Sequence, residues 1–273
     1  MSAATSARPA EPRDGRAVTF ARVVRSERIK LLTLRSTWWV LALTLLAVVA
    51  VPVLPAALYA ADPASLAGAL GPDVGALTPG TEVAVVTLAV LGVLAVTNEY
   101  SSGMVRATMT AVPRRTPVLL AKGVVLAVLA ALLGVVGVLL AWVVTLPLYG
   151  DAAPSLATAT AWRVVLGSGV RLAGVALLAL AVGALLRSAA GAVAVVLGLL
   201  LVLPGVLTVA GFATGVEAFG RVVPFLPGQA GAVVTQVAPT GDPLGPWTGL
   251  LVMAAWIAVL GGAAVALLRS RDV

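Results

Sequence analysis

The segment 98–122, NEYSSGMVRATMTAVPRRTPVLLAK, is a large polar stretch between two long apolar parts of the chain. Its charged residues lie among serines and threonines, and they are Glu99, Arg106, Arg114, Arg115 and Lys122. Charged side chains can form strong hydrogen bonds to ionised groups on a partner protein or to anionic lipid headgroups. The chemistry that this segment offers is therefore recognition rather than bond making.

Most catalytic chemistry is excluded by residue types and motifs that the sequence lacks. The chain contains no cysteine and no histidine, which removes disulfides, thiolate chemistry and the usual zinc sites. No GxxxxGK[ST] sequence occurs, so the chain cannot bind a nucleotide through a P-loop. No HExxH or GxSxG motif occurs either. We therefore expect a protein that is not an enzyme and that binds no metal or cofactor of its own.

Two further charged residues, Glu82 and Arg171, fall at or within apolar stretches. Arg171 precedes Leu186 by about 22 Å of helix at about 1.5 Å per residue, which places it toward one edge of a hydrocarbon core about 30 Å thick. Either residue could extend its charge to the membrane surface or could line a path for a substrate.

The elements that must position these residues follow from the composition. The chain has 273 residues, of which 60% are hydrophobic and 11% charged, with a mean hydropathy of +1.08. Apolar blocks of about 18 or more residues indicate membrane-spanning helices. The sequence predicts an all-α integral membrane protein with six spans, at about 38–60, 82–97, 118–146, 166–186, 191–212 and 247–268. Pro52, Pro55 and Pro204 should kink the spans that contain them.

The N-terminal part has two sections before the first span. Residues 1–16 are rich in Ala, Pro and Arg, and we expect them to be disordered. Residues 17–37 have apolar side chains at roughly helical spacing and predict an amphipathic helix on the membrane surface. Four charged residues of this helix are candidate interfacial contacts: Arg25, Glu27, Lys30 and Arg35. Glu27 interrupts the apolar stripe.

The distribution of lysine and arginine predicts the orientation in the membrane. The N-terminal section holds eight of these residues, segment 98–122 four, position 187 one and the C-terminal tail 269–273 two, so fifteen of 18 lie on one side. Positively charged loops remain cytoplasmic. We expect six spans with both termini cytoplasmic, and segment 98–122 on the same side.

Within that segment, the apolar residues repeat with the period of a helix. Tyr100, Met104, Ala107 and Ala111 follow this period, and Pro113 should end the helix. Such a short helix can dock into a groove on a cytoplasmic partner. An ordinary basic loop that only fixes the topology is the alternative.

Residues 26–39 (SERIKLLTLRSTWW) and 98–115 (NEYSSGMVRATMTAVPRR) closely resemble the membrane subunit of type-2 ABC transporters, in the bacterial branch where permease and ATPase are separate chains. FLPGQAG (225–231) and the C-terminal stretch 245–272 are similar to the same family. Arg171 stands where the family leads us to expect an uncharged residue, and Arg28-Ile29 where we expect a tryptophan and a small polar residue.

The resemblance implies the permease subunit of an ABC transporter, usually an exporter, in a bacterial plasma membrane. It implies two permease subunits, either identical or related, each on a cytoplasmic ATPase subunit that uses ATP and Mg. Helix 98–113 would be the coupling helix, and helix 17–37 would be the connecting helix in contact with membrane lipid. No nucleic acid is expected as a partner. The coupling residues would be Glu99, Tyr100, Ser101, Ser102, Gly103, Met104, Val105, Arg106, Pro113, Arg114 and Arg115.

Several alternatives stay open at this stage. Glu99 and Arg106 could contact the ATPase, form a local salt bridge or remain solvated, and Arg114 and Arg115 could act only on topology. An ion-coupled carrier is a second function, although such carriers usually need an ionisable group at mid-membrane. A membrane scaffold that transports nothing is a third. The substrate is not indicated by the sequence.

Overall fold

The computed structural model describes residues 19–101, 115–238 and 243–270, and every regular element in these residues is helical. Six helical segments are long and apolar enough to cross a membrane: Arg35–Ala61, Val74–Tyr100, Thr116–Ala152, Ala159–Leu186, Ala189–Thr214 and Pro246–Leu268. The predicted all-α architecture with six apolar segments is confirmed for this part of the chain. It fits a protein that crosses a membrane several times.

The N-terminal helix is separate from the first apolar segment. α1 (Phe20–Thr33) ends before Leu34, whose backbone is extended with φ −78° and ψ 120°, and α2 (Arg35–Ala50) begins directly after it. The expected helix over 17–37 is therefore divided at Leu34. The indole N–H of Trp38 donates to the carbonyl oxygen of Leu32 at 2.7 Å, which satisfies one of the last carbonyls of α1 and holds the bend.

The first apolar segment continues past a break at Pro52, as the sequence predicts, into α3 (Val53–Ala61). α4 (Pro63–Leu70) and the short η1 (Val74–Leu77) then reverse the chain. The Asp62 carboxylate caps α4 by accepting from the Ser65 N–H at 3.2 Å. A hydrogen bond from the Ser65 hydroxyl, together with this backbone contact, lowers the pKa of Asp62. α5 (Pro79–Ser101) returns along the bundle.

The core of the bundle is α8. α7 (Arg115–Tyr149) and η2 (Gly150–Ala152) lead into α8 (Ala159–Leu186), which packs against α5, α7 and α13 (Pro246–Ser270). In the most apolar 18-residue window of α8, 72% of residues are buried, against 11% for α13. α13 is thus a peripheral helix, and α8 is the helix around which the others assemble.

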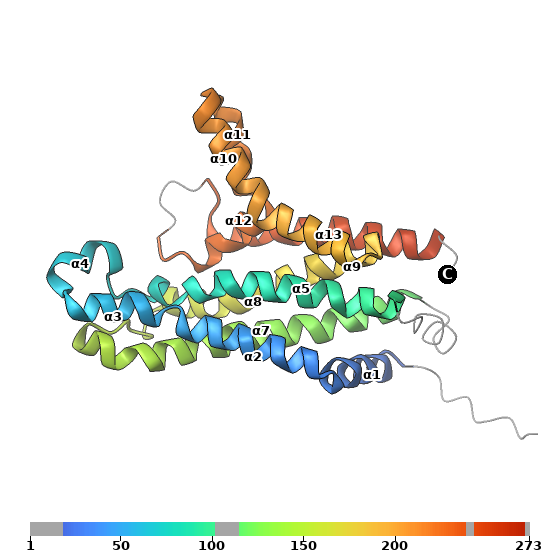
Figure 1. The fold of residues 1–273 in the computed structure, drawn as a ribbon, viewed down its shortest axis with the longest axis horizontal. Coiled ribbons are helices and arrows are strands. Elements are labelled where there is room, and N and C mark those ends of the chain that lie inside the picture. Colours follow the sequence, from blue (N-terminus) through green and yellow to red (C-terminus); the bar gives the residue numbers. More distant parts are fainter. Residues whose placement is uncertain (1–18, 102–114, 239–242, 271–273) are drawn as a thin grey trace, which may run out of the picture.

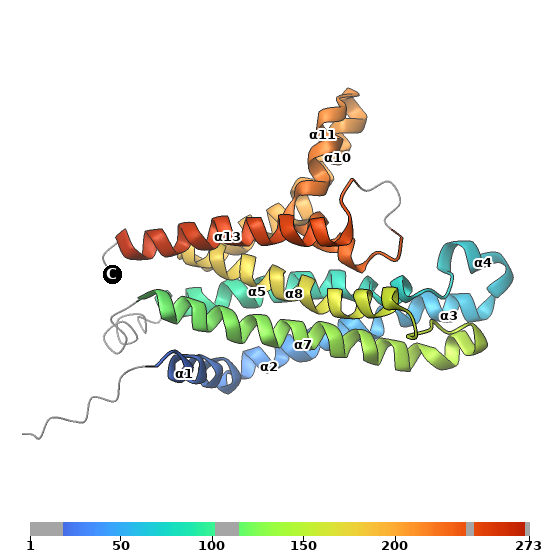
Figure 2. The ribbon, with the colours of Figure 1, turned by 180° about the vertical axis from the view of Figure 1, so that it is seen from behind.

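The fifth apolar segment bends within its length. α9 (Ala189–Leu197) lies along the bundle and passes through one π-helical turn, η3 (Gly198–Val202), into α10 (Leu203–Thr214). Figures 1 and 2 show α10 and the following α11 (Glu217–Val222) leaving the bundle as a projecting hairpin. A π turn beside a proline is a common cause of such a kink, and Pro204 is the second residue of α10, two positions after η3 ends.

The connection from α11 to α13 contains short helices, as the sequence suggests for this long stretch. They are η4 (Val223–Phe225), α12 (Pro227–Ala232) and η5 (Val233–Thr235). The Arg163 guanidinium on α8 donates to the carbonyl oxygens of Val234, Gln236 and Val237 at 2.8, 2.8 and 3.1 Å. These bonds anchor the connection to the central helix.

One end of the bundle gathers the elements that matter for the candidate site. α1, the last turn of α5, the first turn of α7 and the last turn of α13 all lie at this end in Figure 1. We call this the α1 end. The turn between α8 and α9 lies at the same end, whereas α4 lies at the opposite end.

Candidate functional site

The residue that interrupts the apolar stripe of α1 lies on the buried side of that helix. Val23, Glu27 and Leu31 are the buried residues of α1, each four positions after the last. Val23 packs on Val118 and Ala121 of α7. Glu27 therefore faces the same helix, and its side chain is only 2% exposed.

A lysine from α7 binds this buried carboxylate. Lys122 Nζ lies 2.5 Å from Glu27 Oε2 and 3.0 Å from Glu99 Oε1, and its side chain is 4% exposed. Glu99 comes from the last turn of α5. The pairing therefore joins α1, which is distant in the sequence, to the neighbouring helices α5 and α7.

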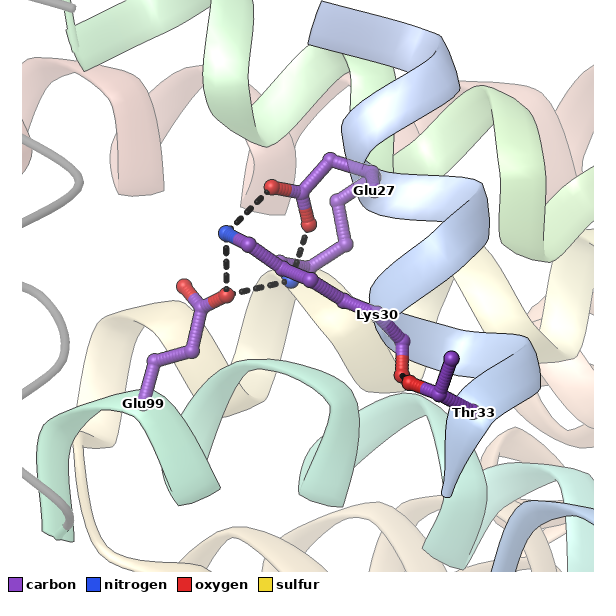
Figure 3. Close-up of polar contacts among 5 residues, drawn as sticks. Glu27, Lys30, Thr33 and Glu99 are labelled. Atoms are coloured by element: carbon purple, nitrogen blue, oxygen red, sulfur yellow. Dashed lines mark hydrogen bonds and ion pairs between the residues drawn. The ribbon is translucent and has the colours of Figure 1, made fainter. Parts of the chain in front are cut away.

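A second lysine completes the arrangement. Lys30 Nζ lies 2.7 Å from Glu27 Oε1 and 3.1 Å from Glu99 Oε1, so that the Glu99 oxygen accepts from both lysines (Figure 3). Burial lowers the pKa of Lys30, but its hydrogen bond to Glu27 and the charges of Glu99 and Glu27 outweigh burial and raise that pKa overall. We call Glu27, Lys30, Glu99 and Lys122 the four-charge cluster.

The cluster is electrically neutral, and opposite charges alternate around it. Three of the four side chains, those of Glu27, Lys122 and Glu99, are 2%, 4% and 13% exposed. Removing such charges from water costs several kcal/mol per ion, and close pairing with well-formed hydrogen bonds offsets that cost. Such a group stabilises only one arrangement of the three helices, because any shift of one helix exposes a buried charge to an apolar neighbour. Both carboxylates are already paired with lysines, so the cluster fixes the positions of the helices and offers no free group for catalysis.

The residue after Glu99 makes a separate contact at the same end. The Arg187 guanidinium lies 5.1 Å from the centre of the Tyr100 ring, a cation–π distance. Arg187 forms the tight turn between α8 and α9 and has a left-handed backbone with φ 54°. That conformation is unusual for a residue with a side chain and is held here by the turn and the ring contact.

The two charged residues of the apolar stretches bind each other. Arg171 Nη1 lies 2.6 Å from Glu82 Oε1 and Nη2 lies 2.8 Å from Glu82 Oε2, a bidentate pair between α8 and α5. Arg171 Nη1 also lies 3.3 Å from the Thr81 hydroxyl oxygen. The interpretation of Arg171 as a side chain that extends to the membrane surface is wrong, because its side chain is 5% exposed within the bundle.

The structure brings together only some of the residues that the sequence singles out. Glu27, Lys30 and Glu99 meet in the four-charge cluster, Tyr100 lies beside it, and the side chains of Arg25 and Arg35 are exposed. The following candidates lie outside the described residues: Ser102, Gly103, Met104, Val105, Arg106, Pro113 and Arg114. The backbones of Ser101 and Arg115 end α5 and begin α7. Most of the predicted coupling helix therefore remains a prediction.

Sequence reasoning missed how Glu99 and Lys122 are used. Glu99 was expected to contact a partner, pair within its own helix or remain solvated, whereas it binds lysines from two other helices. Two signals were available. Glu27 sits on an apolar stripe, and Lys122 lies several residues inside a predicted span, so each needs a buried partner of opposite charge.

No group of three or more acidic residues that could hold a metal ion occurs within residues 19–101, 115–238 and 243–270. In comparisons with known proteins, no protein-family model matches the chain. No curated protein matches it either.

Proposed function

We propose that this chain is the transmembrane permease subunit of an ABC transporter, working as an exporter with a separate cytoplasmic ATPase. The observation that carries the proposal is the string 98–115, which resembles the coupling segment of type-2 ABC permeases and connects α5 to α7. The residues on either side of that connection, Glu99 and Lys122, bind the α1 helix. This arrangement suits a segment that must pass movement to the bundle.

The mechanism follows from what an ATPase can act on. Its ATP and ADP states change the permease only if they contact it differently, and helix 98–113 is the surface that we assign to that contact. Because the four-charge cluster joins α5, α7 and α1, a displacement of the segment moves all three helices together. The Tyr100 and Arg187 contact extends the same linkage to the turn between α8 and α9.

The rest of the proposal concerns partners and place. The partner ATPase binds and hydrolyses ATP with Mg. A second permease subunit, identical or related, completes the transmembrane part in a bacterial plasma membrane. Both termini and the ATPase are cytoplasmic, and exposed basic residues, Arg25 of α1 and Arg35 at the start of α2 among them, face lipid headgroups.

One observation weighs against an ion-coupled carrier. Glu82 lies within the apolar segment Val74–Tyr100, and both of its oxygens already accept from Arg171. A proton or sodium ion would have to displace a bidentate guanidinium to bind there. The permease assignment needs no such step.

The proposal is tested by co-purification from native membranes. The chain, tagged at its C-terminus and extracted in several mild detergents, should bring with it a P-loop ATPase in roughly equal amount. Arg106→Ala together with Arg114→Ala should release that ATPase or uncouple its ATP hydrolysis from transport. Arg221→Ala is the matched control, because it removes an exposed arginine on α11 far along the chain from the segment. If no ATPase accompanies the chain in any of the detergents, the proposal fails.

A further inference from the structure

A narrow strip of α5 is left uncovered by its neighbours. α5 packs against α8, α2 and α9, and Figure 1 shows it between α2 and α9. The exposed and partly exposed residues recur every three or four positions, which places them on one face of the helix. We call this face the α5 strip, and it consists of Glu82, Val83, Val86, Thr87, Val90, Leu94 and Asn98.

The strip carries a fixed charge within an apolar segment. The side chain of Glu82 is 59% exposed, whereas that of its partner Arg171 is 5% exposed. The Arg171 guanidinium lies inside the bundle, where it also donates to the Thr81 hydroxyl oxygen. Its two hydrogen bonds to Glu82 hold that carboxylate at the surface of the bundle. Glu82 therefore points its free lone pairs at whatever covers this face.

Lipid is a poor environment for that carboxylate. Acidic side chains within spans are rare and almost always face the bundle interior or a water-filled cavity, and Glu82 lies within the apolar segment Val74–Tyr100. Other exposed faces of the bundle present large apolar side chains instead, such as Leu46 and Leu54 on the first segment and Leu251 and Val259 on α13. The bundle thus has faces suited to lipid, and the α5 strip differs from them.

The strip also has the length of a crossing. Glu82 and Asn98 are separated by about 24 Å at about 1.5 Å per residue, compared with a hydrocarbon core of about 30 Å. Both ends are polar and exposed, while the residues between them are aliphatic except Thr87, whose hydroxyl is bonded to the Thr44 hydroxyl and to the Ala84 carbonyl oxygen. A surface of this kind matches a solute with an apolar body and a polar head.

We propose that the α5 strip faces water rather than lipid and lines the path of an amphipathic solute, with Glu82 as the polar contact at the α4 end. The identification of this surface with a transport path rests on the proposed function. Its exposure to water does not, because it is argued from the burial of Arg171 and the exposure of Glu82 alone.

The chain is suited to a direct test because it has no cysteine of its own. Val83→Cys, Val86→Cys and Val90→Cys would be introduced singly in the full chain in native membranes and treated with a membrane-impermeant, charged methanethiosulfonate. Only the thiolate reacts, and thiolates form in water but not in hydrocarbon. Leu132→Cys on α7 and Leu251→Cys on α13 are controls, because these residues are 57% and 70% exposed on apolar faces.

We expect the strip cysteines to react at least tenfold faster than both controls. Rates no higher than those of the controls would overturn the inference, whether lipid or a dry protein contact covers the strip. A second measurement tests the role of Glu82. The ratio of the rates with a cationic and an anionic reagent at Val83→Cys should fall several-fold when Glu82→Gln is added, and an unchanged ratio would contradict a carboxylate directed at the same water.

The outcome is separable from that of the proposed function. Labelling requires no ATPase. If the strip cysteines are unreactive in a chain that still co-purifies with its ATPase, only the proposal about the α5 strip is refuted. If the strip cysteines react in a chain that has no ATPase partner, the permease proposal is refuted, whereas the exposure of the α5 strip to water is supported.

Discussion

Lys122 and Lys30 bind the same two carboxylates from different environments. Lys122 is 4% exposed in its side chain and Lys30 is 30% exposed, although both lie within 3.1 Å of Glu27 and Glu99. An ion pair that water can reach contributes little, whereas a buried charge that loses its partner is strongly destabilised. The two lysines should therefore differ in what their removal costs.

Replacing Lys122 with methionine should destabilise the protein by about 3–5 kcal/mol, because Glu27 would keep a buried charge with only Lys30 to balance two carboxylates. Lys30→Met should cost about 1 kcal/mol, since water reaches that site. Thermal melts of the purified protein in one detergent would compare the two. Adding Glu27→Gln to Lys122→Met should recover part of the loss. Equal melting temperatures for the two lysine variants would contradict this account of burial.

The raised pKa of Lys30 predicts how stability depends on pH. A lysine whose pKa is higher in the folded state stabilises that state fully below its unfolded value, ordinarily 10.5, and loses the contribution as the pH rises through its folded pKa. The groups that face it are Glu27 on its own helix, Glu99 on α5 and, beyond them, Lys122 on α7. The difference in melting temperature between Lys30→Met and the unchanged protein should stay constant from pH 8 to about 10. This difference should become smaller above about pH 10.5, where Lys30 loses its proton. If the difference in melting temperature grew as the pH rose above about 10.5, the pKa of Lys30 would be lowered in the folded protein and not raised.

At the scale of elements, close helix contacts depend on particular glycines. A Cβ added at Gly134 on α7 would lie 2.8 Å from Gly169 Cα on α8 and 2.9 Å from the Ser168 carbonyl oxygen, which are backbone atoms that cannot yield. A Cβ at Gly261 on α13 would meet nothing within 4 Å. The same substitution therefore has opposite consequences at the two positions.

We expect Gly134→Ala to destabilise the protein by about 1–3 kcal/mol, because α7 and α8 must separate to admit the methyl group. Gly261→Ala should be neutral or stabilising by up to about 1 kcal/mol, since alanine is the better helix former. Melting temperatures measured side by side provide the test. A Gly134→Ala protein as stable as Gly261→Ala would mean that the two helices are not packed as closely as described.

Long apolar blocks were the part of the fold that the sequence could predict. Spans of about 20 apolar residues have few alternatives to a helix in a bilayer, because every backbone polar group must be satisfied within the segment. The break at Pro52 was also foreseeable, since proline lacks the N–H that continues a helix. The end of α1 at Leu34 was not, because it depends on Trp38 binding back to Leu32.

The four-charge cluster could be predicted only in part. Glu27 and Lys122 each occupy a position where an isolated charge is costly, so a buried partner was foreseeable for both. Which charges meet depends on how α1 lies across α5 and α7, and that is set by packing between residues nearly 100 positions apart. The Arg171 and Glu82 pair has the same origin, with 89 positions between its members.

At the scale of the whole molecule, the bundle has two unlike ends. The α1 end holds the four-charge cluster, the Tyr100 and Arg187 contact and the ends of the 102–114 connection. The α4 end holds acidic residues, among them Asp62 and Asp73, which cap short helices there. Basic loops remain on the cytoplasmic side, and we therefore propose that the α1 end is cytoplasmic.

That assignment predicts the side of the membrane on which each connection lies. A fluorescent protein fused after Val273 should fluoresce, and alkaline phosphatase fused there should be inactive, because its disulfides form only outside the cytoplasm. Phosphatase fused after Ala157, between α7 and α8, or after Asp242, before α13, should be active. The Asp242 fusion also tests whether the bent α9–η3–α10 segment crosses the membrane, since an inactive enzyme there would mean that it does not. A phosphatase active after Val273 would place α1 and the 102–114 connection outside the cell, where no ATP-driven subunit could reach them. That result would refute both the permease proposal and the proposed orientation. The proposal that the α5 strip faces water would be unaffected, because it depends on the exposure of Glu82 and not on which end of the bundle is cytoplasmic.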